Sequence, residues 1–179
     1  MGVNLVARLW GFSEATLFFI VPDVWLTLAA RENPRPGLIA CLHALGGALI
    51  GGTCMYQWGA WNTTAALHAV EGVPAIGGDM VASVRDALRN QGITAVLIGP
   101  LSGTPYKLYA VQAAQAGISL AEFLLISIPA RLGRFALVTL GAHYALQYVA
   151  KRRPTMDRRR MLLICWAIFY IGYLGLMPW

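Results

Sequence analysis

Two arginines three positions apart interrupt the apolar run LLISIPARLGRFALV, residues 124–138. Because residues three apart share one face of a helix, Arg131 and Arg134 predict a doubly positive patch. A guanidinium presents planar N–H donors that match the oxygens of a phosphate or a carboxylate. Two central arginines raise the free energy of membrane insertion by about 5–7 kcal/mol, which a lipid-facing helix would not tolerate without compensation. The pair therefore predicts a hydrated cavity that binds an anion.

Three further ionisable residues also lie in apolar segments, namely Glu14, Asp23 and Lys107. We expect the two acids to pair with the arginines, and to exchange protons where water reaches them. A second interpretation stays open, in which the ion pairs only fasten one segment to another. Buried ion pairs are weak indicators of stabilisation, since apolar packing usually does as well.

The composition indicates the environment in which these charges lie. Of 179 residues, 58% are hydrophobic and 12% are charged, whereas a soluble domain usually carries about 25% charged residues. Apolar runs of helix length then predict an all-α integral membrane protein with a single membrane domain. The net charge is +6, and basic residues crowd into KRRPTMDRRR, residues 151–160. This loop predicts a cytoplasmic anchor beside anionic lipids rather than a nucleic-acid partner.

The cysteines and histidines show no spacing that would bind a metal. No CxxC, HExxH or similar motif occurs, so we expect neither a metal site nor a disulfide framework. The sequence also lacks a recognisable nucleophile–base set, so an enzyme is the least favoured class and no cofactor is expected. We interpret these six residues as packing or surface residues: Cys41, Cys54, Cys165, His43, His68 and His143.

Prolines break two of the apolar segments, because proline removes a helix donor and clashes with the preceding turn. Residues 3–30 contain Pro22 and predict a first re-entrant hairpin of two short helices. Residues 93–117 contain Pro100 and Pro105 and predict a second re-entrant hairpin.

Three other segments are long and apolar enough to cross the hydrocarbon core, at about 1.5 Å per residue. They are residues 37–60, 119–150 and 156–177, and the second begins at SLAE, a capping box. Residues 62–92 are more polar and predict a connection that contains an interfacial helix over 81–90. Two halves, each a broken hairpin followed by a span, are typical of inverted repeats in transporters. One final transmembrane helix follows them.

The distribution of basic residues predicts the orientation. If each hairpin returns to the side from which it enters, the first hairpin and residues 151–160 are cytoplasmic, and residues 62–92 lie on the far side. Nine basic residues are then inside and two outside, in agreement with the positive-inside rule. They are Arg8, Arg31, Arg35 and six residues of 151–160 inside, against Arg85 and Arg89 outside.

The order of several motifs resembles the DedA-like family, also described by its VTT or SNARE-associated domain. GFSEATLFFIVPDVWLTLAA (11–30) resembles the first hairpin of that family, and GALIGGTCMYQWG (47–59) resembles its following span. GPLSGTPYKLYAVQAAQAGISLAEF (99–123), followed by PARLGRF (129–135), resembles its second hairpin and the helix that carries basic residues. The similarity covers most of residues 12–140.

The resemblance implies a transporter that moves lipid phosphate, undecaprenyl phosphate or a phospholipid, between the leaflets of a bacterial inner membrane. Arg131, Arg134 and Lys107 would bind the phosphate head group, and Glu14 and Asp23 would couple its movement to protons or gate it. A proton-coupled transporter of a small solute or drug is one alternative, and a non-transporting assembly factor is the other. Glycines along the first span permit close helix contact, either within the chain or in a homodimer.

Overall fold

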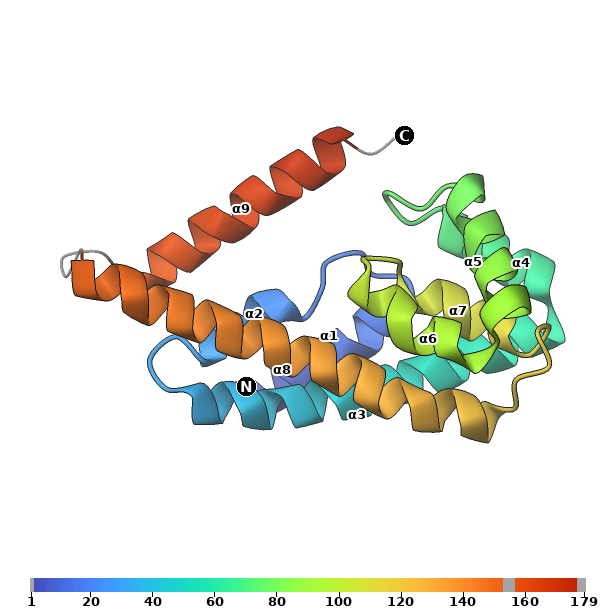
Figure 1. Ribbon diagram of the computed structural model, residues 1–179, viewed down its shortest axis with the longest axis horizontal. Coiled ribbons are helices and arrows are strands. Elements are labelled where there is room, and N and C mark those ends of the chain that lie inside the picture. Colours follow the sequence, from blue (N-terminus) through green and yellow to red (C-terminus); the bar gives the residue numbers. More distant parts are fainter. Residues whose placement is uncertain (1, 153–156, 177–179) are drawn as a thin grey trace.

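The computed structural model describes residues 2–152 and 157–176, and across these residues all regular structure is helical (Figure 1). The elements are α1 (Val3–Ala15), α2 (Asp23–Ala29), α3 (Pro34–Trp61), α4 (Thr63–Glu71), α5 (Gly78–Gln91), α6 (Ile93–Ile98), the short 3-10 helix η1 (Gly99–Leu101), α7 (Tyr106–Ala113), α8 (Leu120–Arg152) and α9 (Arg158–Leu176). The predicted all-α class is confirmed for the described residues.

Asparagine side chains cap the start of the long helix α3 and the start of the helix that follows it, α4. The Asn33 side chain accepts a hydrogen bond from the Arg35 N–H at 2.9 Å, and Pro34 occupies the first helical position, where its missing N–H does no harm. Asn62 follows the last residue of α3, and its side chain caps the first turn of α4. The helix predicted over residues 37–60 is therefore confirmed, and it begins earlier because Asn33 and Pro34 form a start signal.

The other long helix, α8, begins at the predicted capping box. The Ser119 N–H donates to Glu122 Oε2 at 2.9 Å, and the Glu122 N–H donates to Ser119 Oγ at 3.3 Å. The helix predicted over residues 119–150 is thus confirmed, and it continues with Pro129 inside it. Among the described residues, α3 and α8 are the two helices long and apolar enough to cross a membrane.

Glycines bring α1 and α3 into backbone contact. A Cβ at Gly11 of α1 would overlap the carbonyl of Ala44, and one at Gly47 of α3 would overlap the carbonyl of Arg8. Small residues allow such an approach without a hydrophobic driving force between the helices. The close contact predicted from the glycines of the first span is therefore made inside the chain.

Both broken segments contain the predicted interruptions. In the first, α2 begins directly after Pro22. In the second, Pro100 lies in η1 and α7 begins directly after Pro105. Each proline sits at the start of a helical turn, where its fixed φ is tolerated, rather than in a helix interior.

The two broken segments pack on the long helices in a related way (Figure 1). Helix α1 lies along α3, and α6 lies along α8. Helix α7 mainly contacts the long helix of the other half, α3, whereas α2 contacts α3 and α8 equally, and α3 and α8 also contact one another. The fold therefore interleaves its two halves.

The connection over residues 62–92 forms two helices, α4 and α5, whereas the sequence analysis predicted one helix over 81–90. Helix α5 buries Val81, Val84 and Leu88, whose spacing of three and four residues is that of an amphipathic helix. Helix α4 was missed, although the cap at Asn62 marks its start.

The last helix, α9, stands away from the remaining helices for much of its length (Figure 1). It contacts α2, where the Trp166 Nε1–H donates to Thr27 Oγ1 at 3.0 Å. A helix is therefore present where the final span was predicted over 156–177, although residues 156 and 177 themselves lie outside the described residues.

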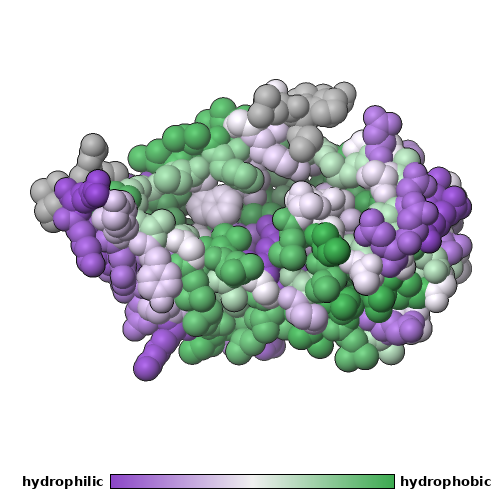
Figure 2. Space-filling model, in the orientation of Figure 1, coloured by the Kyte–Doolittle hydropathy of each residue, from purple (hydrophilic) through white to green (hydrophobic). Residues whose placement is uncertain are grey.

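The surface is apolar in the middle and polar at the two ends of the long axis (Figure 2). Hydrophilic residues gather over α4 and α5 at one end, and near the end of α8 and the start of α3 at the other. Large apolar side chains are exposed between them, including Leu42, Ile50 and Leu137. Such a band is typical of a protein that lies in a lipid bilayer.

Candidate functional site

A cavity of about 150 Å³ lies among the two breaks, α8 and α9, and we call it the central cavity. Figure 2 shows hydrophilic colour in a hollow at the middle of the apolar face. Four of the five predicted charged residues line the cavity, and the fifth, Asp23, bonds to one of them. The charged lining residues are Glu14, Lys107, Arg131 and Arg134, and two of the three predicted break prolines, Pro100 and Pro105, line it as well.

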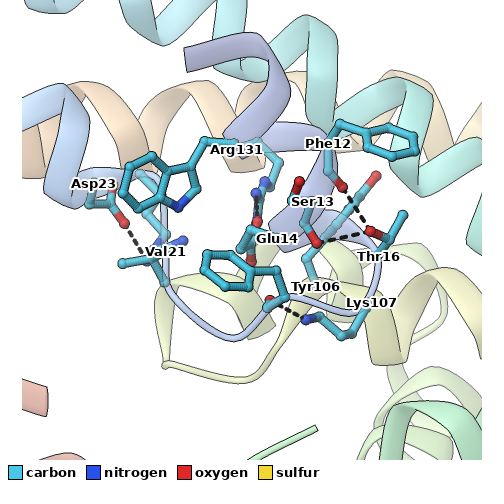
Figure 3. A network of polar contacts seen from close by, with 12 residues as sticks. Phe12, Ser13, Glu14, Thr16, Val21, Asp23, Tyr106, Lys107 and Arg131 are labelled. Carbon is cyan, nitrogen blue, oxygen red and sulfur yellow. Dashed lines mark hydrogen bonds and ion pairs between the residues drawn. The ribbon is translucent and has the colours of Figure 1, made fainter. Parts of the chain in front are cut away.

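Arg131 forms a buried two-point ion pair with Glu14 (Figure 3). Its Nη1 donates to Glu14 Oε1 at 3.3 Å, and its Nη2 donates to Glu14 Oε2. The Arg131 side chain is 1% exposed and the Glu14 side chain 7%. The predicted pairing of an N-terminal acid with an arginine of α8 is therefore confirmed, and the pair joins the end of α1 to α8.

Two aromatic rings enclose the Arg131 guanidinium. Its carbon lies 4.7 Å from the centre of the Tyr106 ring and 4.8 Å from the centre of the Phe135 ring. The Tyr106 hydroxyl is anchored in turn by a 2.9 Å hydrogen bond to Ser127 Oγ. Sequence analysis missed both rings, although Phe135 lies one helical turn after Arg131, a spacing at which helical side chains meet.

Arg134 pairs with Asp23, the first residue of α2. Its Nη2 donates to Asp23 Oδ2 at 2.6 Å, and the Arg134 side chain is 20% exposed, against 1% for Asp23. Among the described residues, Asp23 Oδ1 and Arg131 Nε are the buried side-chain polar atoms without a hydrogen-bond partner. The second predicted pairing is therefore confirmed, and its arginine is more exposed to solvent than the arginine of the first pair.

Lys107 reaches the cavity from the start of α7 (Figure 3). Its Nζ donates to the carbonyl oxygen of Phe18 at 2.7 Å, and no carboxylate of the described residues lies within ion-pair distance of it. Three cations then face two carboxylates, so the cluster keeps one positive charge. A positive cavity with apolar walls attracts anions, since the surrounding medium screens the field only weakly.

Two further segments complete the walls of the central cavity: aromatic residues of α9, and Val73, Pro74 and Ile76 of the loop before α5. Phe169, Tyr170 and Tyr173 come from α9. Tyr170 is held in place because its hydroxyl oxygen accepts a hydrogen bond from the Val21 N–H at 2.8 Å. Sequence analysis missed this wall, because the periodicity of a helix does not reveal which other segment it will cover.

The buried cysteine and histidine have ordinary hydrogen-bond partners. Cys41 Sγ lies 3.4 Å from Thr139 Oγ1, and His143 lies between the Ala30 carbonyl at 2.6 Å and Gln147 Nε2 at 2.9 Å. These contacts explain both residues without a ligand.

No protein-family model matches the chain, and no solved structure matches it. A protein of Haemophilus influenzae described as uncharacterized is 25% identical over 167 residues, which cover 92% of this chain and 82% of that protein. Its description carries no activity. The fold and the site define the class for the described residues: an all-helical protein with two helices long and apolar enough to cross a membrane, and a cavity lined by buried ion pairs.

Proposed function

We propose that this chain is an integral membrane protein of the DedA-like kind that moves lipid phosphate between leaflets, with undecaprenyl phosphate or a phospholipid as substrate. The observation that carries the proposal is the central cavity, which keeps one excess positive charge inside an apolar body. Charged side chains at such a depth are costly and usually mark a substrate or ion pathway.

The packing supports two inverted repeats with re-entrant hairpins. Each half supplies a broken pair of short helices followed by one long helix, and each sends its second short helix to the long helix of the other half. Substrate sites in repeat transporters lie where such broken helices meet. In the proposed orientation the loop over 151–160 faces the cytoplasm of a bacterium and residues 62–92 face the far side of its inner membrane.

The size of the central cavity favours a head group over a whole molecule. Drug-sized ligands occupy pockets of about 300–1,000 Å³, and the central cavity holds about half the lower limit. In this proposal the phosphate enters the cavity while the apolar chain stays in the surrounding lipid. Lipid phosphate therefore ranks above the alternative, a proton-coupled transporter of a small solute or drug.

Arg134 and Lys107 are the proposed first contacts of the phosphate. Arg134 is partly exposed and has a single ion-pair partner, and Lys107 donates one observed hydrogen bond of the three that an ammonium can make. Arg131 keeps its pair with Glu14, so the excess positive charge of the cluster comes from Lys107. Protonation of Asp23 would release Arg134 to the phosphate, which is how the acid would gate or couple transport.

The test is leaflet exchange in liposomes that contain the purified chain and a labelled polyprenyl phosphate. The variant Lys107→Gln with Arg134→Gln is expected to slow exchange at least about tenfold, because two donors to the phosphate are lost. The matched control is Arg35→Gln with Arg159→Gln, which removes the same charge from exposed positions. Unchanged exchange by the first variant, at equal amounts of folded protein, would refute the proposal.

A non-transporting assembly protein is the second candidate, and the complete burial of Arg131 favours it. Because Glu14 pairs with Arg131 rather than with Arg134, the discriminating variant reverses that pair, Glu14→Arg with Arg131→Glu. Leaflet exchange retained at the wild-type rate in this variant would indicate that the Glu14–Arg131 pair only stabilises the fold. Lost exchange in a folded variant would favour transport.

A further inference from the structure

A second polar cavity, of about 210 Å³, lies among α4, α5 and α7, and we call it the distal cavity. It sits at the hydrophilic end of the molecule formed by α4 and α5 (Figure 2). Its polar lining residues are Arg85 and Arg89 of α5, Gln112 of α7, Gln115 in the turn after α7, and Thr63 of α4. We propose that the distal cavity binds a phosphate group, independently of transport through the central cavity.

The two arginines supply the positive charge of the distal cavity. Arg85 and Arg89 lie four residues apart on α5, so they project from one side of the helix. Among the described residues, neither forms an ion pair with a carboxylate. The acidic residues of the same helix, Asp79 and Asp86, do not line the cavity. Two guanidinium groups therefore share one cavity without an internal counterion.

Helix α7 contributes one buried polar side chain, Gln112, to the lining of the distal cavity. The helix is buried along its whole length, and it carries one charged side chain, Lys107, and one amide side chain, Gln112. Lys107 lines the central cavity and Gln112 lines the distal cavity. The Gln112 side chain is 4% exposed, and its Nε2 makes only long hydrogen bonds, to Val81 O at 3.4 Å and Leu108 O at 3.3 Å. Both of its amide hydrogens are thus held only by long bonds, which a phosphate oxygen at the base of the cavity could replace.

The chemistry of this lining selects phosphate. Planar guanidinium groups bind phosphate oxygens through paired N–H donors, and an amide N–H adds a neutral donor. The N-terminus of α4, at Thr63, adds a partial positive charge of the helix dipole. A cation would find no carboxylate among the lining residues, so the cavity discriminates against it.

The experiment measures phosphate binding to the full chain in neutral detergent by titration calorimetry. It starts from Lys107→Gln with Arg134→Gln, in which the central cavity is disabled, and adds Arg85→Gln with Arg89→Gln. The probes are inorganic phosphate and a short-chain phosphatidic acid, which separate soluble phosphate from a lipid head group. We expect the starting variant to bind one of the probes, and the added pair to weaken binding at least about tenfold.

The matched control adds Arg35→Gln with Arg159→Gln to the same starting variant, which lowers the net charge equally. Weakening confined to the Arg85 and Arg89 variant supports the distal site, whichever probe binds better. Equal weakening by both pairs would show diffuse attraction and overturn the proposal, as would absence of binding to both probes in the starting variant. None of these results depends on leaflet exchange, so failure of the transport proposal is recognised separately.

Discussion

Replacing Glu14 by glutamine tests the buried ion pair most directly. The amide keeps the size of the side chain but removes the charge that balances Arg131, whose side chain is 1% exposed. Removing one partner of a buried pair costs about 3–5 kcal/mol, because the remaining charge stays desolvated. Asp23→Asn removes the partner of Arg134, which is 20% exposed and can turn to water. The same chemical change there is expected to cost less, about 1.5–3 kcal/mol.

The assay is unfolding of the purified chain in mixed micelles by increasing sodium dodecyl sulfate, followed by the fluorescence of its six tryptophans. We expect the double variant Glu14→Gln with Arg131→Met to be more stable than the sum of its single variants predicts, because both buried charges are gone. A loss below about 1 kcal/mol for Glu14→Gln would contradict the argument. So would a larger loss for Asp23→Asn than for Glu14→Gln.

Three further substitutions test the packing and the backbone conformation, each by thermal unfolding in detergent. Gly47→Ala is expected to destabilise the protein by about 1–3 kcal/mol, because the added methyl group would overlap the backbone of α1. The control, Gly46→Ala on the same helix, meets open space and is expected to stabilise by up to about 1 kcal/mol through helix propensity. Equal effects of the two substitutions would argue against the α1–α3 contact. Ala75, with φ of 67° in a loop beside the central cavity, is strained for a side chain, so Ala75→Gly is expected to stabilise by about 1 kcal/mol. A destabilised Ala75→Gly variant would contradict that assignment.

The sequence predicted the elements that position the central cavity because their signals are local. The capping box at Ser119 and the breaks at Pro22 and Pro105 follow from the chemistry of neighbouring residues. The pairing of the acids with the arginines could be predicted because a charged side chain in an apolar segment carries a high free-energy cost unless it has a partner. Which acid meets which arginine did not follow, because that choice depends on how α1 and α2 pack against α8.

Other parts of the site required three-dimensional information. Tyr106 and Phe135 are aromatic residues in apolar segments, where packing is their ordinary role. The spacing of Phe135 from Arg131 allows a contact, but no sequence pattern shows that Tyr106 covers the same guanidinium. Tyr170 lines the central cavity only because α9 folds back over α2. The distal cavity joins Arg85 of α5 to Gln112 of α7, and sequence spacing cannot indicate a contact of that kind.

The two central ion pairs join residues 117 and 111 positions apart in the chain. At about 5–20 residues per second of synthesis, each carboxylate leaves the ribosome roughly 6–23 s before its arginine. During that interval Glu14 and Asp23 lack the arginines with which they pair in the folded chain, so under the proposed membrane location an early release of the first helices into lipid is unfavourable. Co-translational insertion is therefore expected to be staged, with the insertion machinery retaining the nascent first helices until the carboxy-terminal half arrives.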